Sequence, residues 1–271
     1  MTRLEKSVPV TARKKVAVVV PTYLRDSFSA DEEFAIRHID AYLSKYDRFL
    51  VAPESLRIER PGFVTRYVPD RYFGSTEAHS LMLLNPAFYA LFSEYEYILL
   101  HHLDAFVLCD RLDEFCALGY DYMGPPWLET PWLPGPPLPK DKRVGNGGFS
   151  LRRVASFQRL TSRVREAMQY PRSMDFKDVR GRLLTVLRLP YVNETLWEKF
   201  ARRLIDDWFV ARCATELVPE FRIAPFDVAL SFGFEGDPDR CFELNQRRLP
   251  FGVHQWNRHK RTFWEPHLLG A

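Results

Sequence analysis

Lys15-Val16-Ala17-Val18-Val19-Val20-Pro21-Thr22-Tyr23 is the stretch of sequence that decides the fold. Its run of valines, interrupted by one alanine, is typical of a parallel strand that is buried on both faces of a sheet. Pro21 marks the end of this strand, because proline has no N–H to donate to a neighbouring strand. The sequence therefore predicts a central strand of an α/β sheet close to its start.

Helical and strand patterns alternate along the chain after this strand. Helices are expected over 31–46 and 75–92, where Pro86 should break or kink the helix, and strands are expected over 49–52, 65–68 and 97–100. Such an alternation predicts an α/β fold with a mostly parallel central sheet and helices on both faces. Beyond it, 151–217 is expected to be mainly helical, and the chain from Phe221 to form short strands and turns. We expect a single domain over 14–271, preceded by a flexible tail over 1–13.

The composition is that of an ordinary globular protein and excludes several classes. The formal net charge of +3 over 271 residues does not favour a nucleic-acid-binding protein. The four cysteines form no CxxC pair, which argues against a zinc site or a disulfide framework and fits a reducing compartment. The N-terminus has no apolar signal region, and no apolar run is long enough to span a membrane.

These features predict a cytoplasmic protein.

Arginines cluster between Arg143 and Arg165. A solvated helix face explains such a cluster, but attraction of a diphosphate or peripheral contact with the inner face of the membrane stays an alternative.

Strand ends supply the first candidate site. Ligands of such sheets bind beyond the carboxyl ends of the strands, a rule that selects Pro21–Arg25, Pro53–Glu54 and His102–Asp104. Asp104 is suited to hold a divalent cation that neutralises a diphosphate leaving group. The common signature for that task is Asp-x-Asp, whereas the first acid is replaced here by His102. A lone aspartate at this place is also a frequent turn former.

A glycine-rich string, Gly-Asn-Gly-Gly-Phe-Ser-Leu-Arg over 145–152, is the second candidate. Glycines permit positive φ and close backbone approach, so amides of Asn146, Gly147 and Gly148 could hold a sugar hydroxyl or a phosphate. The Lys-Ser/Thr ending of a P-loop is absent. An ordinary turn is the alternative.

Two further motifs carry groups suited to catalysis. Asp207 follows another acid and precedes an aromatic residue, and a carboxylate in an apolar cleft can deprotonate an acceptor hydroxyl. The alternative is an acid pair at a helix N-terminus. Pro250–Trp256 presents His254, whose imidazole could complete a Mn²⁺ shell. His101, His102 and His254 could also form a transition-metal site without sugar chemistry.

A proline-rich stretch over 125–139 contains two tryptophans. It is too apolar for a solvent-exposed linker. We expect a shaped surface loop that serves as a lid or as an acceptor platform.

These motifs occur in the order of a known family. Val16–Tyr23 resembles the opening strand of GT-A glycosyltransferases. Tyr95–Leu108, Gly119–Trp127, Gly145–Arg152 and Pro250–Trp256 resemble a bacterial domain family of unknown function, found in polysaccharide and glycan gene clusters and grouped with the GT-A transferases. The resemblance runs from about Val16 to Trp264 and implies a single GT-A-like domain.

The resemblance also implies roles for individual residues. Asp104 corresponds to the last acid of Asp-x-Asp, His254 to a late metal-binding histidine, and His102 is a further candidate ligand. Asp207 matches the second acid of a Glu-Asp pair that supplies the base in inverting relatives, although Asp206 replaces the glutamate. The implied nucleotide-sugar site consists of Pro21, Thr22, Tyr23, Arg25, Glu54, Asp104, Asn146, Gly147 and Gly148.

The function implied is transfer of a sugar from a nucleoside-diphosphate sugar to a hydroxyl of a glycan or other acceptor. Inversion with a carboxylate base and Mn²⁺ or Mg²⁺ is expected, although His102 in place of an acid leaves metal dependence open. A nucleotide- or glycan-binding module of the same fold without catalysis is the alternative. A sugar-phosphate nucleotidyltransferase is less favoured, because no glycine-rich loop follows the first strand.

Overall fold

The computed structural model describes residues 13–129, 138–140, 143–169 and 205–269. Most of the expected N-terminal tail lies outside these residues, as do the middle of the proline-rich loop and a large part of the stretch expected to be helical.

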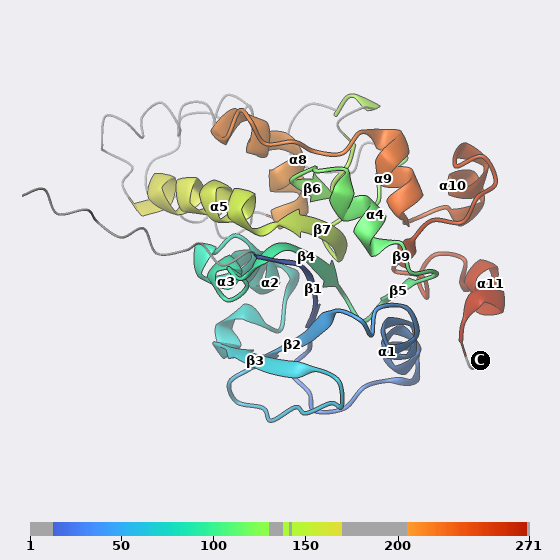
Figure 1. Cartoon of the computed structure of the whole chain (residues 1–271), viewed down its shortest axis with the longest axis horizontal. Coiled ribbons are helices and arrows are strands. Elements are labelled where there is room, and N and C mark those ends of the chain that lie inside the picture. Colours follow the sequence, from blue (N-terminus) through green and yellow to red (C-terminus); the bar gives the residue numbers. More distant parts are fainter. Residues whose placement is uncertain (1–12, 130–137, 141–142, 170–204, 270–271) are drawn as a thin grey trace, which may run out of the picture.

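A six-stranded sheet forms the centre of the molecule (Figure 1). The first four strands in its order β3-β2-β1-β4-β7-β6 are parallel, whereas β7 runs antiparallel to β4 and to β6. The predicted α/β class, with a mostly parallel central sheet flanked by helices, is confirmed. The strands are β1 (Lys14–Pro21), β2 (Asp47–Pro53), β3 (Val64–Val68), β4 (Tyr95–His101), β6 (Tyr122–Met123) and β7 (Phe149–Arg153).

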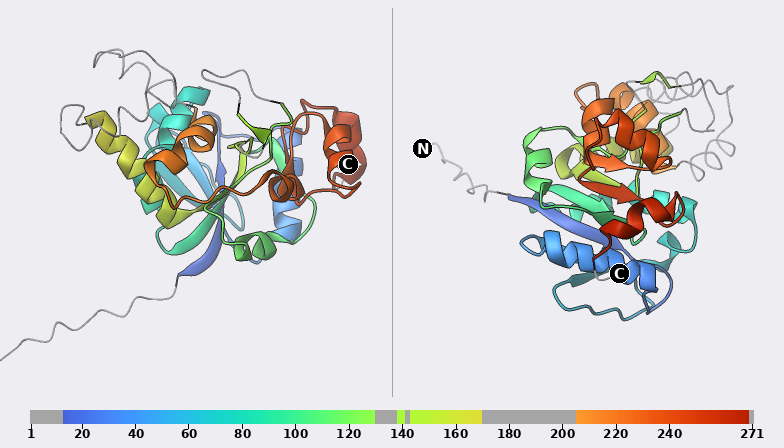
Figure 2. Two further views of the ribbon diagram at one scale, coloured as in Figure 1. Left: turned by 90° about the horizontal axis from the view of Figure 1, so that it is seen from above. Right: turned by 90° about the vertical axis from the view of Figure 1, so that its right-hand side faces the viewer.

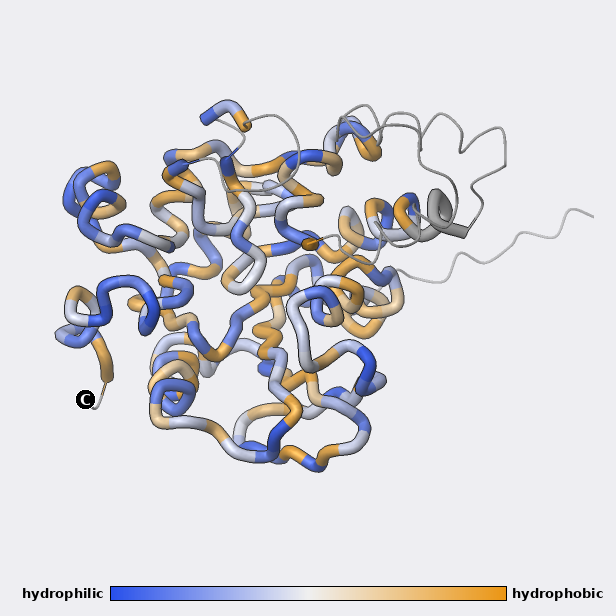
Figure 3. Tube along the Cα trace, turned by 180° about the vertical axis from the view of Figure 1, so that it is seen from behind, coloured by the Kyte–Doolittle hydropathy of each residue, from blue (hydrophilic) through white to orange (hydrophobic). Residues whose placement is uncertain are grey.

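Strand β1 lies between β2 and β4 and is covered on both faces. Val16, Val18 and Val20 pack into one hydrophobic cluster, and Ala17 and Val19 pack into another on the opposite face. This double burial explains the uninterrupted apolar run of the sequence. Hydropathy along the trace shows apolar segments where the chain crosses the middle of the molecule (Figure 3).

Helices cover both faces of this sheet, which gives three layers (Figure 2). Residues of α1 (Ala30–Tyr42) and α4 (Leu112–Ala117) belong to the cluster on the Val18 face. The opposite cluster contains residues of α2 (Thr76–Leu83), α3 (Pro86–Ala90), α5 (Val154–Gln169) and α8 (Asp206–Leu217).

The break expected at Pro86 is confirmed. Helix α2 ends at Leu83, and α3 begins at Pro86 with Asn85 as its N-cap; the Asn85 side chain accepts a hydrogen bond from the N–H of Ala87. Proline suits this first helical position, where its missing N–H would have no partner within the helix. Asn85 and Pro86 therefore determine locally where α2 gives way to α3.

A second, three-stranded sheet lies beside the first and carries part of the candidate site. Strand β9 (Gly252–His254) pairs antiparallel with β5 (Ala105–Val107) and parallel with β8 (Gly233–Phe234). A third hydrophobic cluster around Phe106 and Trp256 packs against it. The remaining elements are η1 (Asp70–Tyr72), α9 (Phe226–Phe232), α10 (Pro238–Leu244), α11 (Arg261–Trp264) and η3 (Glu265–His267).

Two expectations about the second half of the chain were incomplete. Residues 151–153, expected to be helical, belong to β7, because alternate residues there pack into the sheet. The segment after Phe221 contains three α-helices besides its short strands. Within the described residues, no helix is both long and apolar enough to cross a bilayer.

The central strands should dominate the stability of the fold. Leu99 of β4 is completely buried, and Leu99→Ala is expected to lower the free energy of unfolding by about 2–5 kcal/mol through lost contacts and a cavity. The exposed Leu244 of α10 is a matched control, for which the same truncation should change stability by about 1 kcal/mol or less. Denaturant unfolding measures both values, and equal effects would contradict this account of the core.

Candidate functional site

A cavity of about 610 Å³ opens beyond the carboxyl ends of β1 and β4, as the strand-end rule predicts. Residues from both sheets and from α2 and α8 line it. Among the residues selected from the sequence, the cavity brings together Pro21, Thr22, Tyr23, His102, Asp104, Asn146, Gly147, Gly148, Asp207 and His254.

Arg25 and Glu54 do not line this cavity. The guanidinium of Arg25 pairs with Glu32 at the start of α1 and donates to the carbonyl of Ser27. Glu54 follows β2 with its side chain exposed. Both residues follow strand ends, but their side chains are turned to other partners or to solvent.

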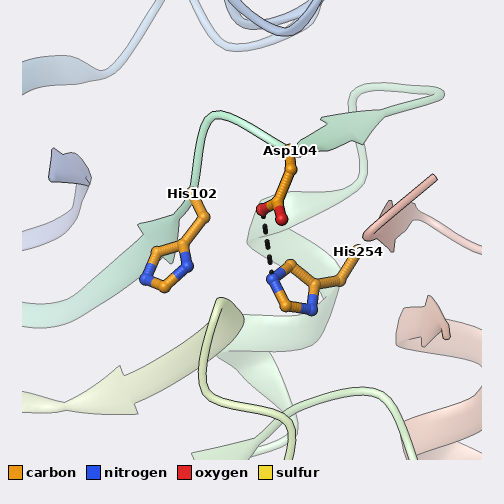
Figure 4. Close-up of side chains that lie close together, drawn as sticks. All are labelled: His102, Asp104 and His254. Atoms are coloured by element: carbon orange, nitrogen blue, oxygen red, sulfur yellow. Dashed lines mark ion pairs between the residues drawn. The ribbon is translucent and has the colours of Figure 1, made fainter. Parts of the chain in front are cut away.

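Three side chains from two segments form a candidate cation cluster (Figure 4). His102, Asp104 and His254 each offer one ligand atom, and these atoms lie within 4.8 Å of one another. His254 Nε2 is 3.2 Å from Asp104 Oδ1, and His254 Nδ1 is 3.5 Å from Glu235 Oε1. Pairing of Ala105 with His254 in the second sheet fixes this arrangement.

The donor atoms of this cluster fit a divalent cation. Both ring nitrogens of His254, Asp104 Oδ1 and Glu235 Oε2 are buried and make no hydrogen bond of good geometry, although His254 lies close to both carboxylates. Buried polar atoms without a hydrogen bond are costly, so this group has room for a further partner. Two imidazoles with one or two carboxylates form a mixed nitrogen and oxygen donor set that suits Mn²⁺ and related transition metals.

Electrostatics at the cluster also favour a bound positive charge. Burial by itself would lower the pKa of His254, but the carboxylates of Asp104 and Glu235 outweigh it and raise the pKa to about 10. Burial would raise the pKa of Asp104, yet His254 holds it well below its usual range. Either a proton on His254 or a cation can therefore compensate the two carboxylates.

The glycine-rich string packs directly against this cluster. A Cβ at Gly148 would overlap the rings of His254 and His102, so only glycine fits there. The carbonyl of Gly148 accepts a hydrogen bond of 2.7 Å from the His102 N–H. The Gly148 amide donates to Asn146 Oδ1, and the Gly147 amide donates to Asp207 Oδ2. These two amides are thus engaged within the protein, rather than free for a sugar or phosphate as expected.

Arg152, at the end of the string, forms a buried ion pair with Asp206. Its Nη2 donates to Asp206 Oδ2 at 2.8 Å and to the carbonyl of Gly147 at 3.3 Å. Its other nitrogens donate to the hydroxyls of Ser150 and Tyr89. The guanidinium is completely buried, and its contacts join β7, α3 and α8 to the glycine-rich string; of the residues contacted, Gly147 and Asp206 line the cavity.

Asp207 is the neighbouring acid at the N-terminus of α8, and it faces the cavity. Its Oδ2 accepts from the Gly147 amide at 3.1 Å, and its Oδ1 accepts from the Trp208 amide at 2.6 Å. Burial raises the pKa of Asp207 to about 7, and the negative charge of Asp206 adds to the effect, against the lowering by the two amides. A carboxylate with this pKa suits a general base near neutral pH.

Comparison with known proteins places the chain in a family. A family described as "Protein of unknown function (DUF5672)" matches residues 62–254, well over half of the sequence. The chain belongs to this family. No curated protein matches the sequence. That the family is one of unknown function agrees with the resemblance stated from the motifs; its bacterial setting in glycan gene clusters stays a prediction.

Solved structures of glycosyltransferases are similar at a distance. One is a glycosyltransferase involved in the glycosylation of the major capsid of PBCV-1, with 12% identity and a TM-score of 0.48 over 93% of this chain and 98% of that one. Another is the glycosyltransferase GlyE in Streptococcus pneumoniae TIGR4, with 14% identity and a TM-score of 0.46 over 96% of this chain and 61% of that one. Likeness at this level says nothing of donor, acceptor or mechanism.

Several cavity residues were missed by sequence reasoning. His79 of α2, Glu235 after β8 and Arg258 after β9 all line the cavity. Of these residues, only Arg258 could have been suspected from the sequence, because it follows the Pro250–Trp256 motif and lies four residues after His254. His79 and Glu235 stand in segments without a motif, and only the folded arrangement brings them to the site.

The buried ion pair should be essential for the stability of the cavity wall. Asp206→Ala leaves the guanidinium of Arg152 buried without its partner and is expected to lower the free energy of unfolding by about 3–5 kcal/mol. Glu243→Ala removes the exposed pair with Arg247 and should have only a slight effect. Denaturant unfolding of both variants tests this contrast, and similar losses would refute a special role for the buried pair.

Proposed function

We propose that this chain is a glycosyltransferase that moves a sugar from a nucleoside-diphosphate sugar to a hydroxyl of a glycan or other acceptor, within a single GT-A-like domain over 14–271. One observation carries the proposal. A single cavity joins Asp207, whose pKa is near neutral, to the cation cluster of Asp104 and His254. A base and a charge-neutralising centre are the two groups that transfer from such a donor requires.

The spacing of these groups supports the proposal. Gly147 lies against Asp207, with its Cβ position 3.3 Å from the Asp207 Cβ, and the next residue, Gly148, lies against His254. The base and the cluster therefore adjoin consecutive residues of the glycine-rich string and line the same cavity. A sugar bound in this cavity can meet the acceptor near Asp207 and release its leaving group near the cluster.

The chemistry follows from these positions. Asp207 accepts the proton of the acceptor hydroxyl while the oxygen of that hydroxyl forms a bond to the anomeric carbon of the donor sugar. The bond from that carbon to the diphosphate oxygen breaks, and the diphosphate leaves with the electron pair. Attack opposite the leaving group inverts the configuration.

Positive charge near the cluster would stabilise the diphosphate that leaves. His102, Asp104 and His254 would hold a divalent cation, Mn²⁺ or Mg²⁺, that neutralises negative charge on the diphosphate. The exposed Arg258 lines the same cavity and adds a second positive charge there.

Two groups of lining residues suggest how the substrates lie. Pro21, Thr22 and Tyr23 line it at the end of β1, where the ring of the partly exposed Tyr23 is available to a nucleotide. Trp127, half-buried against Gly145, lines it beside the glycine-rich string. Trp127 belongs to the proline-rich loop expected to form an acceptor platform, and aromatic faces suit the apolar faces of sugars. The middle of that loop lies outside the described residues.

Removal of the base tests the proposal most directly. Asp207→Asn should lower the rate of sugar transfer by about 10²–10⁴-fold, because the amide cannot accept the proton. Donor binding should stay within a few-fold, since Asp207 does not hold the diphosphate. Donor hydrolysis and transfer are measured over a panel of UDP-, GDP-, dTDP- and CMP-sugars, with binding measured by thermal shift. Full activity in the variant would remove the base assignment, and binding without turnover by the unaltered chain would favour a binding module.

The acid limb of the pH profile provides an independent check. Because the pKa of Asp207 is raised to about 7, this base is protonated and inactive at lower pH. We expect kcat/KM to fall by about tenfold per pH unit below neutrality and to level off above it. The residual activity of Asp207→Asn should lack this limb. An unchanged kcat/KM down to about pH 5, close to the ordinary range of a carboxylate, would contradict the raised pKa.

A further inference from the structure

The imidazole of His102 in the cation cluster contacts a second imidazole, that of His79, which has no role in the proposed reaction. His79 Nε2 lies 2.9 Å from His102 Nε2, with ring planes at 73° and centroids 4.7 Å apart. His79 comes from α2, an element that contributes no residue to the cluster. The contact therefore links a cluster residue to a helix that also lines the cavity.

The chemistry of this contact restricts the proton positions. Two ring nitrogens at 2.9 Å form a hydrogen bond only if one carries a proton and the other a lone pair. If His102 donates from Nε2, a neutral His102 has its lone pair on Nδ1. If His79 donates instead, the proton of His102 sits on Nδ1, which then cannot bind a cation.

Nδ1 is the nitrogen of His102 that faces the cluster. It lies 2.7 Å from the Cβ position of Gly148, which also adjoins His254 Nε2. In Figure 4 one ring nitrogen of His102 points toward Asp104 and His254, and the other points away from them. A cation among these three side chains therefore favours the arrangement in which His102 donates to His79.

We propose that His79 is a positioning residue: it accepts the Nε2–H of His102 and so presents the Nδ1 lone pair to a divalent cation held with Asp104 and His254. Glu235, 3.5 Å from His254, supplies a second carboxylate to the same group. This inference rests on the proposed function for its use in catalysis. It also sets the cation class, because a donor set with two imidazoles favours a transition-metal dication such as Mn²⁺ over Mg²⁺, which prefers oxygen ligands.

Cation binding to the full chain, without any nucleotide sugar, tests the inference. Free Mn²⁺ is counted by electron paramagnetic resonance during titration, and Mg²⁺ is added as competitor. His79→Phe keeps an aromatic ring but removes the acceptor, and it should weaken Mn²⁺ binding by about 10–100-fold and reduce the preference over Mg²⁺. His79→Gln should retain most of the affinity, because its amide oxygen can accept the same N–H. His267→Phe, at a histidine outside the cavity, should behave as the unaltered chain.

A second measurement keeps the inference testable if His79→Phe does not fold. Electron spin-echo modulation of Mn²⁺ bound to the unaltered chain should detect coupling to imidazole nitrogen. Its absence, equal competition by Mg²⁺, or unaltered Mn²⁺ affinity in a folded His79→Phe variant would each overturn the inference. Mn²⁺ binding that depends on His79 in a chain without transferase activity would support it while removing the proposed function.

Discussion

The buried ion pair between Arg152 and Asp206 is the interaction on which the site depends. The guanidinium makes hydrogen bonds to β7, to the glycine-rich string, to α3 and to α8, through Ser150, Gly147, Tyr89 and Asp206. Asp206 in turn accepts a hydrogen bond from Ser80 of α2. A buried charge of this kind tolerates little displacement, because any lost partner leaves an uncompensated ion in a medium of low polarity. The cavity wall is therefore held together by charge as much as by apolar packing.

The same pair explains why two adjacent acids behave differently. Asp206 points into the protein, where Arg152 compensates its charge at 2.8 Å. Asp207 faces the cavity, forms no ion pair within the described part of the chain, and lies beside the negative charge of Asp206. Burial and this like charge make ionisation of Asp207 harder. Of two neighbouring carboxylates in one helical turn, one is thus held in a buried ion pair, and the other faces the cavity with a raised pKa.

The sequence could predict which strands and motifs supply the site, but not the direction of every side chain or the residues that distant segments add. The apolar run over 16–20, the break at Pro86 and the strand-end rule follow from local chemistry, and the structure places Asp104, His254 and Asp207 in one cavity as the motifs implied. Arg25 and Glu54 also follow strand ends, but a strand end fixes the path of the backbone and not the direction of each side chain. His79 and Glu235 could not be found, because their relevance arises only from the pairing of α2 and β8 with distant segments.

The glycine-rich string makes contacts within the protein that the sequence did not indicate. Its glycines were expected to expose amides to a ligand, as glycine-rich loops often do. In the structure the Gly147 amide orients Asp207, and the missing side chain of Gly148 leaves room for His254 and His102. Two consecutive residues therefore contact different groups, Gly147 the carboxylate of Asp207 and Gly148 the cation cluster. Any residue larger than glycine at 148 would displace the rings of His254 and His102, so the cluster and the string have to pack together at this point.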